Sequence, residues 1–148
     1  REMKIQDDRC LMDVRVVGYQ FPDRVPDKRE TVDYDANWLT VSVRYTGTDF
    51  TAEFQDPCVL TWEVQEAAEA LNRLIDGKIQ DFRTDFLEPF LQIEAEKVGD
   101  EFWLRVCFVC EVDKGERKEI TAAQRMARER LAEILDEVKG VVQRFPKR

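Results

Sequence analysis

The chain has 148 residues, of which 43% are hydrophobic and 36% charged, and this composition fits one globular domain. We expect a single domain over residues 1–148, large enough to bury a core without disulfide or metal. The net charge is −8 and the chain has no histidine, which excludes histidine-based nucleophilic catalysis and every histidine-containing zinc site.

Alternating apolar residues predict β-strands in the first part of the chain. We expect strands over residues 10–18, 38–46 and 49–55, with the last two joined as a hairpin at Gly47. Residues 21–37 contain two prolines and many charges, which predicts a long surface loop. Loops longer than about 12–15 residues are often functional, so this loop is a candidate contact surface.

A helix is predicted next, because apolar residues recur at helical spacing between a cap at Thr61 and a stop at Gly77. Its apolar stripe consists of Val64, Ala67, Ala68, Leu71, Leu74 and Ile75. Its opposite face carries Glu63, Glu66, Glu69, Arg73 and Asp76, and we expect these side chains to face solvent.

The remaining elements complete an α+β pattern. Further strands are expected near residues 79–87, 90–97 and 102–112. A second helix is expected over residues 121–139, capped by Thr121 and ended by Gly140. The order βββ-α-βββ-α predicts a mainly antiparallel sheet of about six strands, with the two helices on one face.

The cysteines and the apolar segments bear on location. Cys107 and Cys110 have CxxC spacing, but they lie in a predicted strand and would point to opposite faces, so they cannot share a metal. Free, buried thiols in a reducing compartment are the expectation. No apolar run reaches the roughly 20 residues of a membrane span, and no signal-peptide pattern begins the chain. We therefore expect a cytoplasmic protein without cofactor, metal or membrane association.

Charge is distributed unevenly along the chain. Residues 1–113 carry a net charge of −12 and residues 114–148 a net charge of +4. An acidic body disfavours direct nucleic-acid binding, which requires neutralisation of phosphates, and suits a basic partner. The basic end of the chain is interleaved with acidic residues, as in an ordinary helix with surface ion pairs.

Residues 56–96 form the strongest charge cluster, with a net charge of −7. One hypothesis is an acidic docking surface for a partner protein, and the other is an ordinary solvated face. The candidate acidic contacts are Glu63, Glu66, Glu69, Asp76, Asp81, Asp85 and Glu88. Tyr34 and Trp38 at the end of the long loop are candidate aromatic anchors, with packing beneath the loop as the alternative.

Several segments resemble the WapI-type immunity proteins, which are bacterial partners of WapA-like contact-dependent toxins. In chain order they are VVGYQFP (16–22), DANWLTVSV (35–43), PCVLTWEVQEAAEAL (57–71), FLEPFLQIE (86–94) and FWLRVCFVCEV (102–112). The resemblance covers about residues 4–112. Position 90 is Phe where the family more often has a small polar residue, and the helix at 63–71 is richer in alanine than usual.

The resemblance implies a protein that neutralises a cognate toxin domain, often a nuclease. From the residues we expect a protein without enzymatic activity, and a monomer or homodimer. It implies no particular contact residues. An acidic, histidine-free domain is a reasonable mimic of nucleic acid for a basic nuclease. Two other hypotheses stay open at this point: a carboxylate- or metal-dependent enzyme, and a structural homo-oligomeric module.

Overall fold

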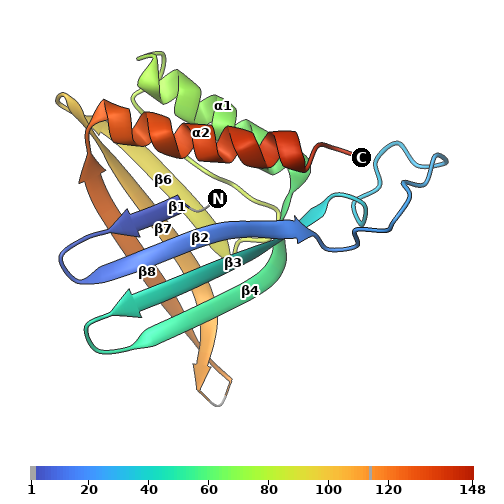
Figure 1. Ribbon diagram of the computed structural model, residues 1–148, viewed down its shortest axis with the longest axis horizontal. Coiled ribbons are helices and arrows are strands. Elements are labelled where there is room, and N and C mark those ends of the chain that lie inside the picture. Colours follow the sequence, from blue (N-terminus) through green and yellow to red (C-terminus); the bar gives the residue numbers. More distant parts are fainter. Residues whose placement is uncertain (1–2, 114) are drawn as a thin grey trace.

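The computed structural model describes residues 3–113 and 115–148, which fold into two four-stranded antiparallel sheets and two helices (Figure 1). The predicted α+β class is confirmed, but the described residues form eight strands instead of about six, in two sheets. The first sheet contains β1 (Met3–Gln6), β2 (Cys10–Tyr19), β3 (Trp38–Gly47) and β4 (Thr51–Leu60). The second contains β5 (Asp81–Arg83), β6 (Leu91–Val98), β7 (Glu101–Asp113) and β8 (Glu116–Met126).

The first sheet is a meander in chain order, β1-β2-β3-β4. The alternation predicted in β3 is confirmed, because Leu39, Val41 and Val43 are buried and the residues between them are not. β4 extends to Leu60, beyond residue 55, where the predicted alternation of apolar residues ends. Pro57 is tolerated there because β4 is the edge strand of this sheet and one side needs no partner.

The second sheet is also a meander, β5-β6-β7-β8. Phe102, Leu104 and Val106 on β7 are buried, so the alternation predicted for this strand is confirmed. The strand predicted near residues 79–87 is only Asp81–Arg83, and residues 84–90 have no strand pairing. All four cysteines are free and buried, and Cys107 and Cys110 lie on β7 as expected.

The prediction for residues 121–126 is wrong. They belong to β8, where Phe102 pairs with Met126 and Val106 pairs with Ala122, so Thr121 caps no helix. Residues 121–126 are rich in alanine and lead into apolar residues at helical spacing, so their local preference is for helix. Antiparallel pairing with β7 overrides that preference. The helix α2 (Arg128–Arg144) therefore begins later, and Gly140 lies inside it instead of ending it.

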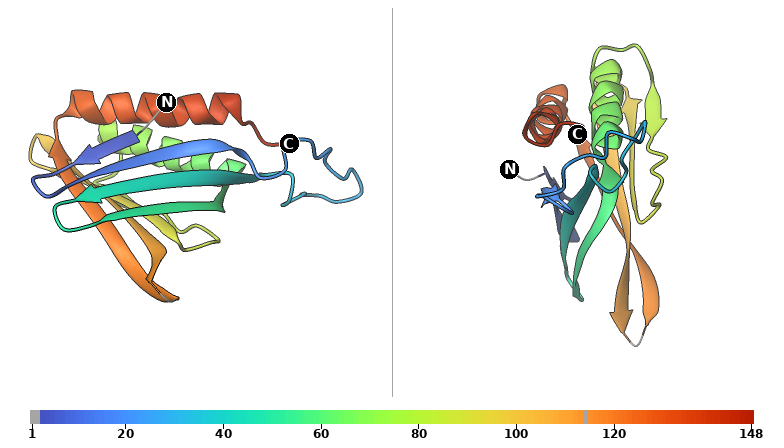
Figure 2. Two further views of the ribbon diagram at one scale, coloured as in Figure 1. Left: turned by 60° about the horizontal axis from the view of Figure 1, so that its bottom comes forward. Right: turned by 90° about the vertical axis from the view of Figure 1, so that its right-hand side faces the viewer.

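The two helices lie side by side at one end of the molecule, and the two sheets form layers that diverge away from them (Figure 2). α1 (Thr61–Ile75) follows β4 directly and ends before Gly77, which has a positive φ of 78° as the predicted stop requires. Buried residues from both sheets and both helices form one core, and the Phe54 and Phe108 rings, 5.9 Å apart, join β4 to β7.

Candidate protein-binding surfaces

One predicted acidic contact, Glu63, is buried. Only 6% of the residue is exposed, so its assignment to the solvent face of α1 is wrong. Its carboxylate accepts hydrogen bonds from the amide of Leu60 at 2.9 Å and from the amide of Leu87 at 2.8 Å. Glu63 therefore accepts a hydrogen bond from a free amide group at the start of α1, where such amides favour a negative charge. It also links the first turn of α1 to the segment before β6.

The other predicted acids form an exposed edge on α1 and the segment that follows it. We call the acidic edge the set Glu66, Glu69, Asp76, Asp81, Asp85 and Glu88. All are exposed except Glu88, which is half-buried. α1 contacts both β5 and β6, which brings the helix and the edge strand to one side of the molecule (Figures 1 and 2). None of the six pairs with a cation among the described residues, so their charges are available to a partner.

The predicted surface loop, residues 21–37, is confirmed and extends away from the body of the molecule (Figures 1 and 2). We call it the projecting loop. Asp33 organises its interior: its carboxylate accepts from Arg24 Nε at 3.1 Å and from the amides of Asp27 at 3.0 Å and Ala36 at 3.2 Å. A second pair, between Arg29 and Asp27 at 3.0 Å, braces the outer part.

The segment after α2 fastens the base of the projecting loop. The Arg148 guanidinium lies 3.8 Å from the centre of the Tyr19 ring. It donates to the carbonyl oxygens of Ala36, Pro22 and Phe21 at 2.8, 3.0 and 2.9 Å. These carbonyls belong to both ends of the loop, so one side chain holds the two ends together. We call this arrangement the Arg148 clamp; nothing in the sequence pattern predicted it.

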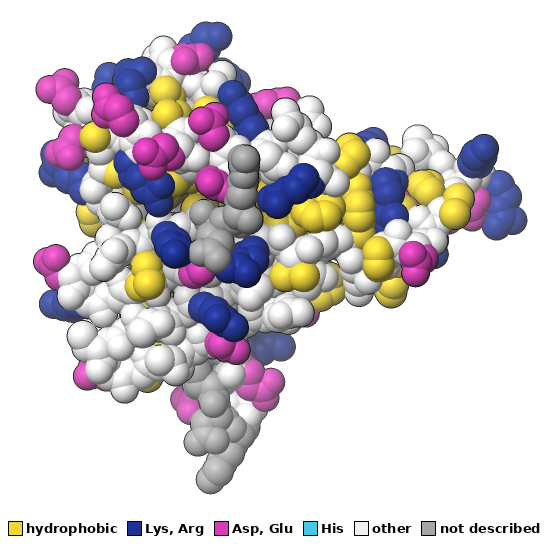
Figure 3. Space-filling model, in the orientation of Figure 1, with side chains coloured by type: hydrophobic (Ala, Val, Ile, Leu, Met, Phe, Trp, Pro, Cys, Tyr) yellow, Lys and Arg dark blue, Asp and Glu magenta, His cyan; other side chains and the backbone are white. Residues whose placement is uncertain are grey.

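The two predicted aromatic anchors differ in exposure. Tyr34 is 49% exposed and packs edge-on against Trp62 of α1, with ring centroids 5.4 Å apart. Trp38 begins β3 and is half-buried, which favours packing beneath the loop for this residue. The prediction missed Val25, which is 80% exposed, although an apolar residue in a charged loop can be recognised from the sequence. Phe21, at the start of the loop, is 45% exposed. Figure 3 shows hydrophobic side chains along the loop and around its base.

Contacts that hold the projecting loop also set the ionisation of its aspartates. Hydrogen bonds from the amide of Asp27, from Arg24 and from the amide of Ala36 lower the pKa of Asp33. The side chain and amide of Arg29 likewise lower the pKa of Asp27. Each bond is made to the ionised carboxylate, so protonation weakens the loop.

Acid should loosen the projecting loop. Because the folded pKa of Asp33 is lowered, its contribution is present above the pKa of an unfolded aspartate, about 3.9, and is lost as the pH falls through the lower folded value. We expect amide protection in residues 21–37, corrected for intrinsic exchange, to fall relative to β3 below about pH 4. Asp33→Ala should show the loosened loop already at neutral pH. If the ratio of loop protection to β3 protection in the wild type does not change as the pH falls through this range, the prediction is contradicted.

The buried thiols and the interior cavity show no catalytic arrangement. Burial raises the pKa of the Cys58 thiol to about 12, which disfavours the reactive thiolate. A cavity of about 80 Å³ between the sheets and helices is lined by apolar side chains and by Glu137 as the one ionisable group among the described lining residues. Within residues 3–113 and 115–148, no three Cys, Asp or Glu side chains are grouped to hold a metal ion. The hypothesis of an enzyme with two converging carboxylates gains no support from this cavity.

The fold thus places its two distinctive features, the acidic edge and the braced projecting loop, on the outside, an arrangement typical of proteins that act by binding. The chain belongs to the immunity protein WapI-like family, whose model matches residues 3–146. This membership confirms the resemblance identified from the sequence motifs and supports a role as an immunity protein. Among curated proteins, none matches the chain. Neither helix in the described part of the chain is long and apolar enough to cross a membrane.

Proposed function

We propose that this protein binds a cognate toxin domain, a basic nuclease, in the cytoplasm and neutralises it through the acidic edge. Family membership supplies the immunity role, and the exposed, unpaired carboxylates of the acidic edge are the observation that carries the mode of binding. A nuclease surface that holds phosphates is positively charged, so the acidic edge would cover it and exclude the nucleic acid substrate. The protein itself would neither bind nucleic acid nor catalyse a reaction.

Charge reversal on the acidic edge should slow association with the toxin. We expect the triple variant Glu66→Lys/Glu69→Lys/Asp85→Lys to associate at low salt on the order of tenfold more slowly than wild type, because electrostatic steering is lost. The three side chains are exposed, so the fold should tolerate the change. The probe is the purified C-terminal domain of the toxin encoded beside this gene, with association rates measured at two salt concentrations and nuclease activity measured on RNA.

A matched variant separates this local effect from the change in net charge. Asp100, Glu129 and Asp136 are exposed, lie outside the acidic edge and have no ion-pair partner among the described residues. Replacing these three with lysine changes the net charge equally and should slow association much less. Equal rates for wild type and the acidic-edge variant would rule out this surface as the docking site, and absence of any wild-type binding would rule out the proposed toxin.

A further inference from the structure

We infer that the projecting loop is a second, apolar contact for the same toxin domain, with Val25 and Tyr34 as its anchors and Arg148 as the residue that positions it. This inference rests on the proposed function and deepens it. The acidic edge would bring the partners together, and the loop would hold them. Four features of the loop support the assignment.

The first feature is the exposure of its apolar side chains. Val25 is 80% exposed and Tyr34 is 49% exposed, on a loop that protrudes from the body (Figures 1 and 2). The exposed part of these two side chains is removed from water only when a partner covers it. Tyrosine is frequent among the residues that dominate binding energy, because it combines a large apolar ring with a hydrogen-bonding hydroxyl.

The second feature is the bracing of the loop. Asp33 ties Arg24, Asp27 and Ala36 together inside it, and the Arg148 clamp closes its base. A loop that is ordered before binding loses little conformational entropy when a partner engages it.

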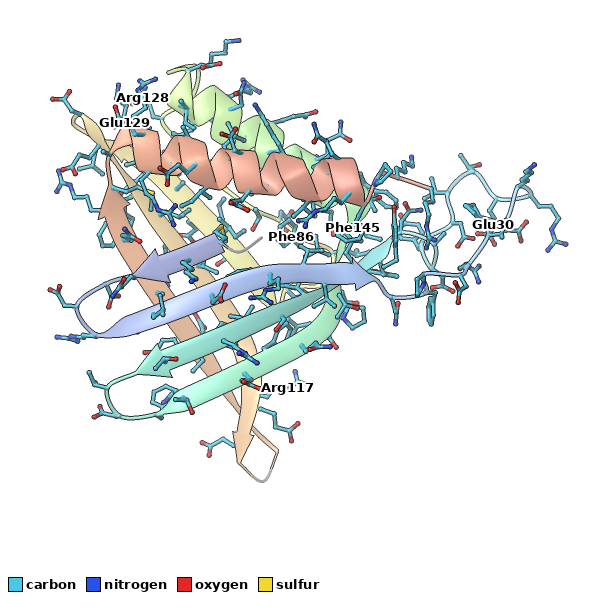
Figure 4. All side chains as sticks on the ribbon, viewed as in Figure 1. Glu30, Phe86, Arg117, Arg128, Glu129 and Phe145 are labelled. Carbon is cyan, nitrogen blue, oxygen red and sulfur yellow. The ribbon has the colours of Figure 1, made fainter. Side chains whose placement is uncertain are left out.

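The third feature is the remaining charge. Two cations of the loop are already used in pairs, Arg24 with Asp33 and Arg29 with Asp27. The exposed charges without a pair among the described residues are Asp23, Glu30, Asp35 and Lys28, a net negative set. Glu30 lies on the outer part of the loop, far from the body (Figure 4). The loop therefore suits the same basic partner as the acidic edge.

The fourth feature is continuity between the two surfaces. Tyr34 packs against Trp62 in the first turn of α1, and Glu66 lies four residues further along, on the same face of that helix. The anchor of the loop and the first carboxylate of the acidic edge are thus neighbours through one aromatic ring. A single partner that contacts Glu66 would reach Tyr34 without any rearrangement of this chain.

Substitution of the anchors tests the inference. With the same purified toxin domain, Val25→Ser/Tyr34→Ala should lower affinity about 10- to 100-fold, mainly through faster dissociation. Val17→Ala is the matched control, because this residue is 53% exposed on β2 and belongs to neither surface, and it should bind like wild type. If the anchor variant keeps wild-type affinity and dissociation rate, the loop is not part of the interface.

The positioning role of Arg148 is tested separately. Arg148→Ala should raise amide exchange across residues 21–37 and weaken toxin binding, and Arg148→Lys should not restore either, because an ammonium cannot make the forked contacts to three carbonyls. Arg125→Ala, which removes an exposed ion pair with Glu101 in the second sheet, away from both surfaces, is the control. If wild type binds and only the acidic-edge variant is impaired, the proposed function stands and this inference fails. If wild type does not bind, the proposed function itself fails.

Discussion

Replacing Phe102 with alanine should lower the free energy of unfolding by about 3–5 kcal/mol, the usual result of removing a fully buried phenylalanine. Phe102 is 1% exposed and lies in the core on β7, opposite Met126 of β8. The guanidinium of Arg128 at the start of α2 lies 5.9 Å from the ring centre. The ring thus packs where the second sheet meets α2, and its loss leaves a cavity that a paired sheet cannot close.

The adjacent residue provides the control for this substitution. Trp103 follows Phe102 on the same strand but points outward and is 38% exposed, so Trp103→Ala should cost less than about 1 kcal/mol. Urea unfolding followed by circular dichroism measures both. Because successive side chains of a strand face opposite sides, reversed costs for these two neighbours would mean that β7 is shifted by one residue. Such a result would contradict the pairing of β7 with β6 and β8.

The parts of the fold that could be read from the sequence are those in which periodicity and burial agree. β3, α1 and β7 each bury one face, so apolar spacing alone predicts their type and orientation. β1 was missed because it is only four residues long and contributes two buried side chains, Met3 and Ile5. The division of the strands into two sheets also depends on which edges meet in space, and that information is not contained in local patterns.

The errors at the candidate sites share one physical cause: contacts between residues distant in sequence override the structure that the local sequence pattern predicts. Glu63 has the spacing of an exposed helix residue, yet the amide of Leu87, which is distant in sequence, makes its burial favourable. Thr61 looks like a helix cap, but its hydroxyl donates to the side chain of Asn37 at 2.8 Å, and Leu60 occupies the cap position. The bracing of the projecting loop likewise depends on Arg148, which follows it by more than a hundred positions.

Four of the sequence segments that suggested the family meet at the base of the projecting loop. Tyr19 comes from the first segment, Asn37 from the second, Thr61 from the third and Leu87 from the fourth. The Tyr19 ring packs against the guanidinium of Arg148. The Asn37 side chain accepts a hydrogen bond from the Thr61 hydroxyl, and the Leu87 amide donates one to Glu63. The residues that identify the family therefore build the junction that supports the loop, and the exposed anchors on it lie mostly outside them.

Asn37 is the centre of that junction, and its replacement by alanine should lower the free energy of unfolding by about 2–4 kcal/mol because buried polar partners lose their bonds. The residue is fully buried. Its amide nitrogen donates to the carbonyls of Asp33 and Arg148 at 2.8 and 3.0 Å. Its amide oxygen accepts from the Thr61 hydroxyl at 2.8 Å and from the Arg148 amide at 2.9 Å. The loop, α1 and the end of the chain are thus joined through one side chain.

Two further variants separate this network from a simple loss of volume. Asn37→Asp keeps the shape but turns a carboxylate oxygen toward the carbonyls of Asp33 and Arg148, which raises the pKa of the introduced group. The loss of unfolding free energy in Asn37→Asp relative to wild type should therefore shrink as the pH falls, since the protonated form can donate a hydrogen bond and is favoured in the folded state.

Asn72→Ala removes one hydrogen bond at 3.3 Å to Asp76 on the surface of α1 and should change the free energy of unfolding by less than about 0.5 kcal/mol. Thermal and urea unfolding of the three variants at two pH values decide the matter: equal losses for Asn37→Ala and Asn72→Ala would mean that the junction does not depend on this buried amide.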